Sequence, residues 1–301
     1  MTTSCTVCIP HIDKPHYLRC CLDSIAEYSN PSIDVQILVM DQSGDTLDKV
    51  RAAARTEKNY ELDVDYHRIN SIDAGYPIDE SLQYAEGEFF CSLDCDAWPI
   101  NHNWLFMPIC LIKDLGVAFV GKETGLGQHS KDMGEFYVIN NYFRVALTDT
   151  MRVLHEEVGF CRPQHRSRCR IPYKHWPRGI EADNGVAANW YVQTKMNQKV
   201  LSLACTKYLG KTKTQGLYGM VIEDLVFHLV FGYCETTLNK PEEELGGDYW
   251  KLRRDLEECG ITTVDVRDMV AKCTPHEKHT SRHIQGEPLD ERTTALIDQL
   301  K

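Results

Sequence analysis

The chain has 301 residues, of which 43% are hydrophobic and 26% charged, and this ordinary globular composition excludes collagen, coiled coils and extended disorder. Its 33 Lys and Arg residues against 44 Asp and Glu residues give a net charge of −11, which argues against non-specific binding to nucleic acids or anionic membranes. No stretch approaches the roughly 18 apolar residues of a membrane span, and we expect no secretory signal. With thirteen Cys residues in no disulfide pattern, we expect a cytoplasmic protein with reduced thiols.

The first hundred residues predict strands that alternate with helices. Apolar runs predict strands over 5–9, 34–40, 62–69 and 88–93, and helical spacing predicts helices over 15–28, 45–58 and 78–86. Such alternation is typical of an α/β fold in which crossover connections make the sheet mostly parallel. Ligands bind such sheets at the carboxyl ends of the strands, so the polar residues that follow each strand are the first candidates for a site.

Beyond residue 105 the pattern is less regular. We expect strands over 116–121, 135–146 and 199–205, helices over 148–157 and 184–196, and a loop over 160–180. The last sixty residues are predicted to form charged helices. We therefore expect one main domain over residues 1–235, with halves 1–104 and 105–235, followed by a helical extension over 236–301.

The segment Asp94-Cys95-Asp96 directly follows the strand predicted over 88–93. Two carboxylates one residue apart point to the same side of an extended backbone. There they can hold a divalent cation through hard oxygen ligands, and the cation can bridge a diphosphate. The alternative is a solvated acidic turn, because two acids at this spacing are common by chance.

The order and spacing of these segments resemble the GT-A glycosyltransferases of the large family 2 type. The matching segments are CTVCIPHIDKPHYLRCCLDSI, LVMDQSGD and AEGEFFCSLDCDAWP. The resemblance is close over about the first hundred residues and looser over the next 130. It implies a GT-A fold, in which helices flank a mostly parallel sheet. It also implies inverting transfer from a nucleotide-diphosphate sugar, with a UDP-sugar favoured as donor and Mn²⁺ or Mg²⁺ as cofactor.

The resemblance assigns donor contacts to residues that follow the predicted strands. Asp41 would contact the base, Asp94 the ribose or a metal-bound water, and Asp96 the metal. The further positions that the resemblance places along the donor are Pro10, His11, Asp13, Asp79 and Cys95.

The chain also departs from the family pattern at positions near the donor. Gln42 stands where a second Asp is usual, Asp79 where Asn is usual, and Ile78 where Arg is usual. His11-Ile12-Asp13 stands where Thr-Tyr-Asn usually follows the Pro. These departures weaken the expected contacts with the uracil base and the diphosphate more than they weaken the expected fold.

A second group of carboxylates lies in Glu181-Ala182-Asp183-Asn184-Gly185, ahead of the helix predicted over 184–196. The resemblance implies that an Asp near this point is the general base that takes the acceptor proton, from across the sugar from the leaving diphosphate. Asp183 is the first candidate and Glu181 the second. Alternatively, both acids only stabilise a helix N-terminus through its dipole.

Three polar residues, Glu223, Asp224 and His228, interrupt the apolar segment 220–231. Polar groups in such surroundings need a partner or a function. By the resemblance, a late His completes the metal site, so His228 is the candidate third ligand. Glu223 and Asp224 are rival bases, and the alternative for His228 is a core residue that is hydrogen-bonded to a neighbour.

The cysteines offer weaker candidates. Cys5 and Cys8 would face opposite sides of one strand, and we expect both to be core thiols rather than a redox or zinc pair. Cys161, His165 and Cys169 have a spacing suited to zinc but no clear fourth ligand.

Two basic or histidine-rich segments are also candidates. The residues from Thr274 to Glu277 form a capping box, which predicts a helix with His276, His279 and His283 on one face. That face either binds a metal or is a polar helix surface. The segment 160–180 holds six Lys and Arg residues and no acid, so it either binds an anionic acceptor or neutralises the acidic body.

We therefore expect a transferase whose partners are a nucleotide sugar and a soluble hydroxyl acceptor, without a membrane. The acceptor alternatives are a glycan, a small molecule, a protein or a modified nucleic acid, with a compact or anionic acceptor ranked above a nucleic acid. One rival class, a nucleotidyltransferase, usually carries a Gly-rich loop after its first strand, whereas IPHIDKP has no glycine. The other rival, a non-catalytic sugar-nucleotide-binding protein, would keep Asp94 and Asp96 but need no base.

Overall fold

The structure is a computed structural model. It describes residues 2–13, 15–71, 73–127, 133, 135–163, 175, 182–209, 219–229, 270–271, 273–275 and 282–300. Among the helices of these residues, none combines the length and the apolar character that crossing a bilayer requires.

The helices and strands follow one another along the chain in this order: β1 (Thr3–His11), α1 (Pro15–Glu27), β2 (Ile33–Asp41), α2 (Leu47–Ala54), β3 (Val64–Arg68), α3 (Tyr76–Ser81), β4 (Phe89–Leu93), β5 (Ala97–Pro99), α4 (Phe106–Leu115), β6 (Phe119–Gly127), β7 (Phe136–Leu147), α5 (Thr148–Glu157), α7 (Val186–Thr194), β8 (Val200–Ser202), β9 (Cys205–Leu209), β10 (Gly219–Ile222), β11 (Val226–His228), β12 (Thr274–Pro275), β13 (His283–Ile284), β14 (Glu287–Pro288) and α12 (Glu291–Leu300).

The central sheet has the order β14-β13-β8-β6-β7-β4-β1-β2-β3. The strands β4, β1, β2 and β3 are parallel, and β7 runs antiparallel between β4 and β6. The predicted α/β fold with a largely parallel sheet and flanking helices is therefore confirmed. Because β1 to β4 are parallel, their carboxyl ends meet at one edge, where Asp41 and Asp94 both lie.

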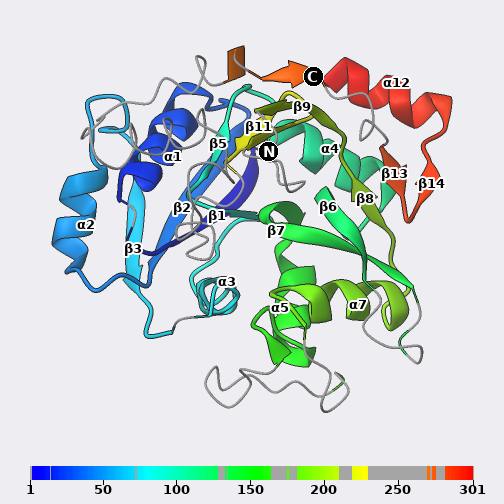
Figure 1. Cartoon of the computed structure of the whole chain (residues 1–301), viewed down its shortest axis with the longest axis horizontal. Coiled ribbons are helices and arrows are strands. Elements are labelled where there is room, and N and C mark those ends of the chain that lie inside the picture. The colour runs from blue at the N-terminus through cyan, green and yellow to red at the C-terminus, as the bar shows by residue number, and fades with distance from the viewer. Residues whose placement is uncertain are drawn as a thin grey trace, which may run out of the picture.

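Helices cover both faces of this sheet (Figure 1). Neighbouring residues of a central strand must then both be buried, as Phe89 and Phe90 of β4 are, in two separate cores. One core packs against α1, α2 and α4, and the other against α3, α5 and α7. Burying one Phe side chain stabilises the fold by about 1.5–3 kcal/mol. Cys5 and Cys8 are buried in the two different cores, which confirms the prediction that they are core thiols facing opposite sides.

A smaller sheet lies beside the central one, with the order β12-β9-β10-β11-β5. It joins segments that are far apart in the sequence, because β5 follows directly after the Asp94–Asp96 segment and pairs with β11. This pairing, between residues 97–99 and 226–228, is what carries His228 to the edge of the central sheet.

The C-terminal segment differs in part from the prediction of charged helices. The helix α12 is present at the end of the chain, but Thr274–Pro275 pairs with β9 and His283–Ile284 pairs with β8. Thr274–Pro275 therefore lies in a strand where the capping box predicted the start of a helix, and His283 lies in β13 rather than on that helix. His276 and His279 lie outside the described residues, so a helix face with three His side chains is not observed.

The strand boundaries show a second difference. We expected β1 to end before Pro10, but it continues through Pro10 to His11, which pairs with Asp41 of β2. Proline is tolerated here because the end of a strand has few remaining ladder hydrogen bonds to lose. As a result His11 stands level with Asp41 at the sheet edge, rather than in a loop beyond it.

Candidate metal centre

Asp94 and Asp96 lie in a tight turn that directly follows β4. The Asp94 backbone N–H donates to the Tyr142 carbonyl (3.0 Å), and the Ala97 N–H donates to the Asp94 carbonyl (2.8 Å). The Cys95 carbonyl accepts a hydrogen bond from the Trp98 indole N–H (3.0 Å). The two carboxylates converge because of this turn, and not because they share one side of an extended strand as the sequence suggested.

His228 reaches the same place from β11. It pairs with Ala97 of β5, and the next backbone N–H, of Leu229, donates to the Asp96 carbonyl (2.9 Å). Its imidazole ring stacks on the Tyr142 ring, with centroids 4.1 Å apart and planes 13° apart. Backbone pairing and ring stacking therefore both fix the direction of this side chain.

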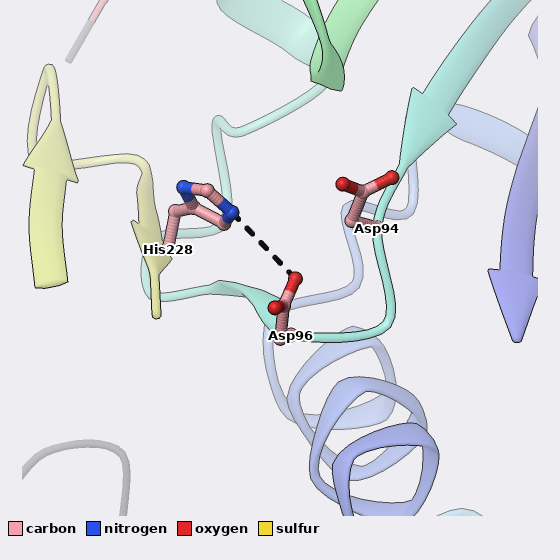
Figure 2. Close-up of side chains that lie close together, drawn as sticks. All are labelled: Asp94, Asp96 and His228. Atoms are coloured by element: carbon pink, nitrogen blue, oxygen red, sulfur yellow. Dashed lines mark ion pairs between the residues drawn. The ribbon is translucent and has the colours of Figure 1, made fainter. Parts of the chain in front are cut away.

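The three side chains point toward one another (Figure 2). One ligand atom from each of Asp94, Asp96 and His228 lies within 4.8 Å of the others, and no other such group of metal-ligating side chains occurs in the part of the chain that the structure describes. His228 Nε2 lies 3.6 Å from Asp96 Oδ1, which is too long for a hydrogen bond. The structure thus brings together the three residues that the sequence proposed as metal ligands.

Two atoms of this group are buried without a hydrogen-bond partner among the described residues, namely Asp96 Oδ1 and His228 Nδ1. Unpartnered buried polar atoms cost free energy unless a ligand or water satisfies them. Burial first, and the neighbouring Asp96 carboxylate second, raise the pKa of Asp94 to about 7, although His228 lowers it. Two carboxylates and the imidazole Nε2 fit a divalent cation, which would satisfy Asp96 Oδ1 and relieve the repulsion between the carboxylates. His228 Nδ1 lies on the side of the ring away from the carboxylates (Figure 2).

Asp41, at the end of β2, differs from Asp94 because several donors already bind its carboxylate. Its carboxylate is fully buried and accepts from His11 Nδ1 (2.7 Å), from the Ser43 N–H (3.2 Å) and from the Ser43 hydroxyl (3.0 Å). Arg68 at the end of β3 adds an ion pair at 2.7 Å. Burial raises the pKa of Asp41, but the hydrogen bonds from His11 and Ser43 outweigh burial and leave the pKa below its usual value.

The other expected donor contacts are dispersed. Pro10 is half-buried beside His11, and Asp13 is exposed with a φ of +46°, its carboxylate accepting from the Gly44 N–H (3.2 Å). Cys95 is fully buried. None of these three adds a ligand atom to the metal group.

Asp79 contacts residues on and just after α5, and not the group around Asp94. Its buried carboxylate accepts from His155 Nδ1 (2.9 Å) and from the backbone N–H groups of Phe160 (2.9 Å) and Cys161 (3.1 Å). Burial raises the pKa of Asp79, while the hydrogen bond from His155 lowers it. This carboxylate therefore joins α3 to the segment that follows α5, and the structure does not bring it into the group around Asp94.

Asp183 precedes α7 and remains accessible. Its side chain is 75% exposed, and Oδ1 accepts from Arg162 Nε (3.1 Å) and from the Asn184 N–H (2.9 Å). Gly185 caps the helix with a φ of +71°, a conformation that suits glycine. Because three quarters of the Asp183 side chain is exposed, the carboxylate remains accessible to a ligand despite these two contacts. Glu181 lies outside the described residues.

The rival bases are held in the fold. Glu223 is fully buried and bound by Arg282 through Nε (2.7 Å) and Nη2 (3.0 Å), and it also accepts from the Ala204 N–H (2.8 Å). Asp224 accepts from the Thr206 hydroxyl (3.1 Å) and pairs with Lys207 (3.5 Å). Both residues have positive φ, as the turn between β10 and β11 requires.

The weaker zinc candidates gain no support. Cys161 is buried, while His165 and Cys169 lie outside the described residues, as does most of the basic segment 160–180. His283 faces Glu123 across the sheet, with Nε2 2.9 Å from Oε2.

The sequence did not suggest two residues that shape the site, Tyr142 and Arg68. Arg68 could have been found from its place at the end of a predicted strand, by the same rule that selected Asp41 and Asp94. Tyr142 carried no signal, since it is one of several aromatic residues in a long apolar strand and its role depends on a partner 86 positions away.

No family model matches the chain, and no curated protein matches its sequence. Among solved structures it is similar to the mannosyltransferase PcManGT from Pyrobaculum calidifontis in complex with GDP-Man and Mn²⁺, with a TM-score of 0.40 and 18% identity over 52% of this chain and 47% of that one. It is similar to S. aureus TarS, with a TM-score of 0.39 and 18% identity over 52% of this chain and 30% of that one. It is also similar to the glucosyl-3-phosphoglycerate synthase from Mycobacterium tuberculosis in complex with Mn²⁺ and UDP-glucose, with a TM-score of 0.35 and 12% identity over 50% and 57% of the two chains.

The chain covers between 30% and 50% of the length of the first solved structures that it matches. Since the TM-scores are below 0.5 and the identities below 25%, the function proposed below rests on the residues of this chain.

Proposed function

We propose that this chain is a GT-A glycosyltransferase of the family 2 type, which moves a sugar from a nucleotide-diphosphate sugar to a hydroxyl group with inversion. The observation that carries the proposal is the convergence of Asp94, Asp96 and His228 at the carboxyl edge of a parallel sheet, where Asp96 Oδ1 is buried without a hydrogen-bond partner among the described residues. In such sheets this edge is where nucleotides bind.

The group would hold Mn²⁺ or Mg²⁺, and the imidazole favours Mn²⁺ because Mg²⁺ prefers oxygen ligands. When bound, the cation offsets the negative charge that develops on the leaving diphosphate. The rest of the donor would lie along the strand ends from β4 toward β1 and β2, with a UDP-sugar favoured.

Asp183 would act on the acceptor side. Its carboxylate is exposed at the N-terminus of α7, so it can take the proton of an incoming hydroxyl group, which is the requirement for a general base in a single displacement. Arg162 would hold this carboxylate in place through the contact at 3.1 Å. Glu223 is a less suitable base because its carboxylate is fully buried and bound by Arg282, and Asp224 is less exposed than Asp183, at 44% against 75%. For the acceptor, we favour a compact glycan or small anionic molecule in solution over a nucleic acid.

A test combines binding with turnover. Mn²⁺ together with UDP, or with UDP-sugars and GDP-sugars, should raise the melting temperature, and a chelator should remove the increase. Slow hydrolysis of one nucleotide sugar by the wild type would support a transferase, provided that Asp96→Asn loses this activity. Asp149→Asn, which changes an exposed carboxylate, is the control and should keep the activity.

The same data separate the rival classes. Binding without any hydrolysis or transfer favours the non-catalytic sugar-nucleotide-binding protein. Release of pyrophosphate from a nucleoside triphosphate favours the nucleotidyltransferase. Full activity in excess chelator would contradict the metal role.

A further inference from the structure

Three polar side chains stand level with one another across the strands next to the metal group. His11 ends β1, Asp41 ends β2 and Arg68 ends β3, and the strand register pairs His11 with Asp41 and Asp41 with Arg68. β4, which leads to Asp94, is the other neighbour of β1. A nucleotide whose diphosphate lies at Asp94 and Asp96 therefore has this row of side chains within reach of its base.

Asp41 has no free acceptor capacity in this row. A carboxylate offers about four lone-pair sites. Here four donors use them, one from His11, two from Ser43 and one from Arg68, at 2.7–3.2 Å. The side chain is also fully buried. An N–H group of a base could bind Asp41 only by displacing one of these donors.

His11 has the free acceptor instead. Its Nδ1 lies 2.7 Å from Asp41 Oδ1, so the ring proton belongs on Nδ1 and is donated to the carboxylate. The other ring nitrogen, Nε2, is buried and has no hydrogen-bond partner among the described residues. In the neutral ring held this way, Nε2 is a lone-pair acceptor. A buried acceptor of this kind calls for a donor in a ligand.

We propose that His11, rather than Asp41, is the specificity-determining residue for the donor base, and that it accepts the ring N–H of uracil or guanine. Asp41 is then a positioning residue, which fixes the proton on Nδ1 and the direction of the ring, and Arg68 holds Asp41. This inference rests on the proposed function, because it needs a nucleotide at the metal group.

The hydrogen-bonding pattern of the bases makes the proposal selective. Uracil and guanine present a ring N–H on the Watson–Crick edge, whereas cytosine and adenine present a ring nitrogen with a lone pair there. Two lone pairs that face each other leave both acceptors unsatisfied. His11 would therefore reject cytosine and adenine. The pairs UDP with CDP and GDP with ADP compare bases of the same ring size, and methylation of UDP at N3 tests the ring N–H separately from the exocyclic groups.

The direct test measures binding of UDP, CDP, GDP and ADP to the wild-type chain in the presence of Mn²⁺. We expect UDP or GDP to bind about 10- to 100-fold more tightly than its matched partner. UDP methylated at N3, which lacks the ring N–H, should bind as weakly as CDP. Equal binding within both pairs, or tighter binding of CDP and ADP, overturns the role of His11. Absence of binding by all four nucleotides overturns the proposed function as well.

Variants provide the second test. His11→Phe keeps a ring but removes the acceptor, so it should abolish the preference for UDP over CDP while pyrophosphate with Mn²⁺ binds as before. His102→Phe, at an exposed His elsewhere, is the matched control and should keep the preference. Asp41→Asn should lower the ratio of UDP to CDP affinity, since an amide no longer fixes the proton on Nδ1. An unchanged ratio in both His11→Phe and Asp41→Asn overturns the proposal, and the methylated nucleotide decides it if either variant does not fold.

Discussion

The carboxylates at the ends of β4 and β2 differ in how far the fold satisfies them. Asp41 is surrounded by four donors, and the pKa of its carboxyl group is below its usual value. Asp94 and Asp96 face each other instead, the pKa of Asp94 is raised to about 7, and Asp96 Oδ1 has no hydrogen-bond partner among the described residues. Both lie at the same sheet edge after an apolar strand, so their position in the topology does not explain the difference.

The comparison shows that a carboxylate at a strand end can serve structure or ligand binding, depending on its neighbours. Asp41 has donors from β1, from β3 and from its own loop, and it is thereby part of the fold. The Asp94 group has a second carboxylate and an imidazole stacked on Tyr142, and no Arg or Lys of the described residues forms an ion pair with either carboxylate. Substitutions at the two places should therefore affect different properties, activity at the one and stability at the other.

The largest effect is expected for Asp96→Asn. Losing this ligand should lower turnover by about 10⁴-fold or more, because a Lewis-acid cation supplies several kcal/mol and each 1.36 kcal/mol is a factor of ten. The melting temperature without metal should stay level or rise, since one of two repelling carboxylates is gone. Sugar transfer and thermal unfolding measure the two properties. A variant that is unstable but fully active per folded molecule would contradict the comparison.

Asp183→Asn should have the next largest effect. Removing a general base costs about 10²–10⁴-fold in rate, while nucleotide binding should be unchanged because we propose that Asp183 acts on the acceptor side. The measurements are transfer to an acceptor and binding of UDP with Mn²⁺. If Asp183→Asn transfers at the wild-type rate, the base is another residue, and Glu181→Gln is then the variant to compare.

For Asp41→Asn we expect a loss of stability. The substitution removes the carboxylate that His11 and Arg68 contact. We expect the free energy of unfolding to fall by about 3 kcal/mol, the lower end of the range for breaking a buried ion pair, because Arg68 is partly exposed. Chemical denaturation gives this free energy of unfolding. Asp149→Asn, which changes a carboxylate that is 94% exposed, is the control and should change stability by less than about 0.5 kcal/mol. Equal stability of the two variants would show that Asp41 is not structural.

The smallest effect concerns pH. The cation needs Asp94 ionised, and burial raises the pKa of this group to about 7, so protons compete with the cation below that pH. Affinity for Mn²⁺ alone should rise about tenfold from pH 6 to pH 8 and then level off, since the ionised fraction rises by about that factor. Titration calorimetry at several pH values measures it. Affinity that is flat or that falls over this range would contradict the raised pKa.

Much of the fold could be predicted because local patterns determine it. The apolar runs and helical spacings of the first hundred residues located β1 to β4 and α1 to α3 in order, and the alternation predicted the parallel sheet. At the C-terminus, the capping box at Thr274 is a local signal, and it did not predict the long-range pairing of Thr274–Pro275 with β9 or of His283–Ile284 with β8. Short strands that complete a distant sheet have no periodicity of their own.

Within the site, the sequence by itself determined which residue types end which strands, and that was enough to select Asp94, Asp96 and Asp41, while the resemblance to the family 2 type added His228. Only the tertiary structure decided how each is used. The pairing of β5 with β11 joins residues about 130 positions apart to complete the metal group, and the register of β1 with β2 sets His11 against Asp41. Whether a carboxylate is satisfied or awaits a ligand depends on donors that other strands supply, and a linear pattern holds no record of those neighbours.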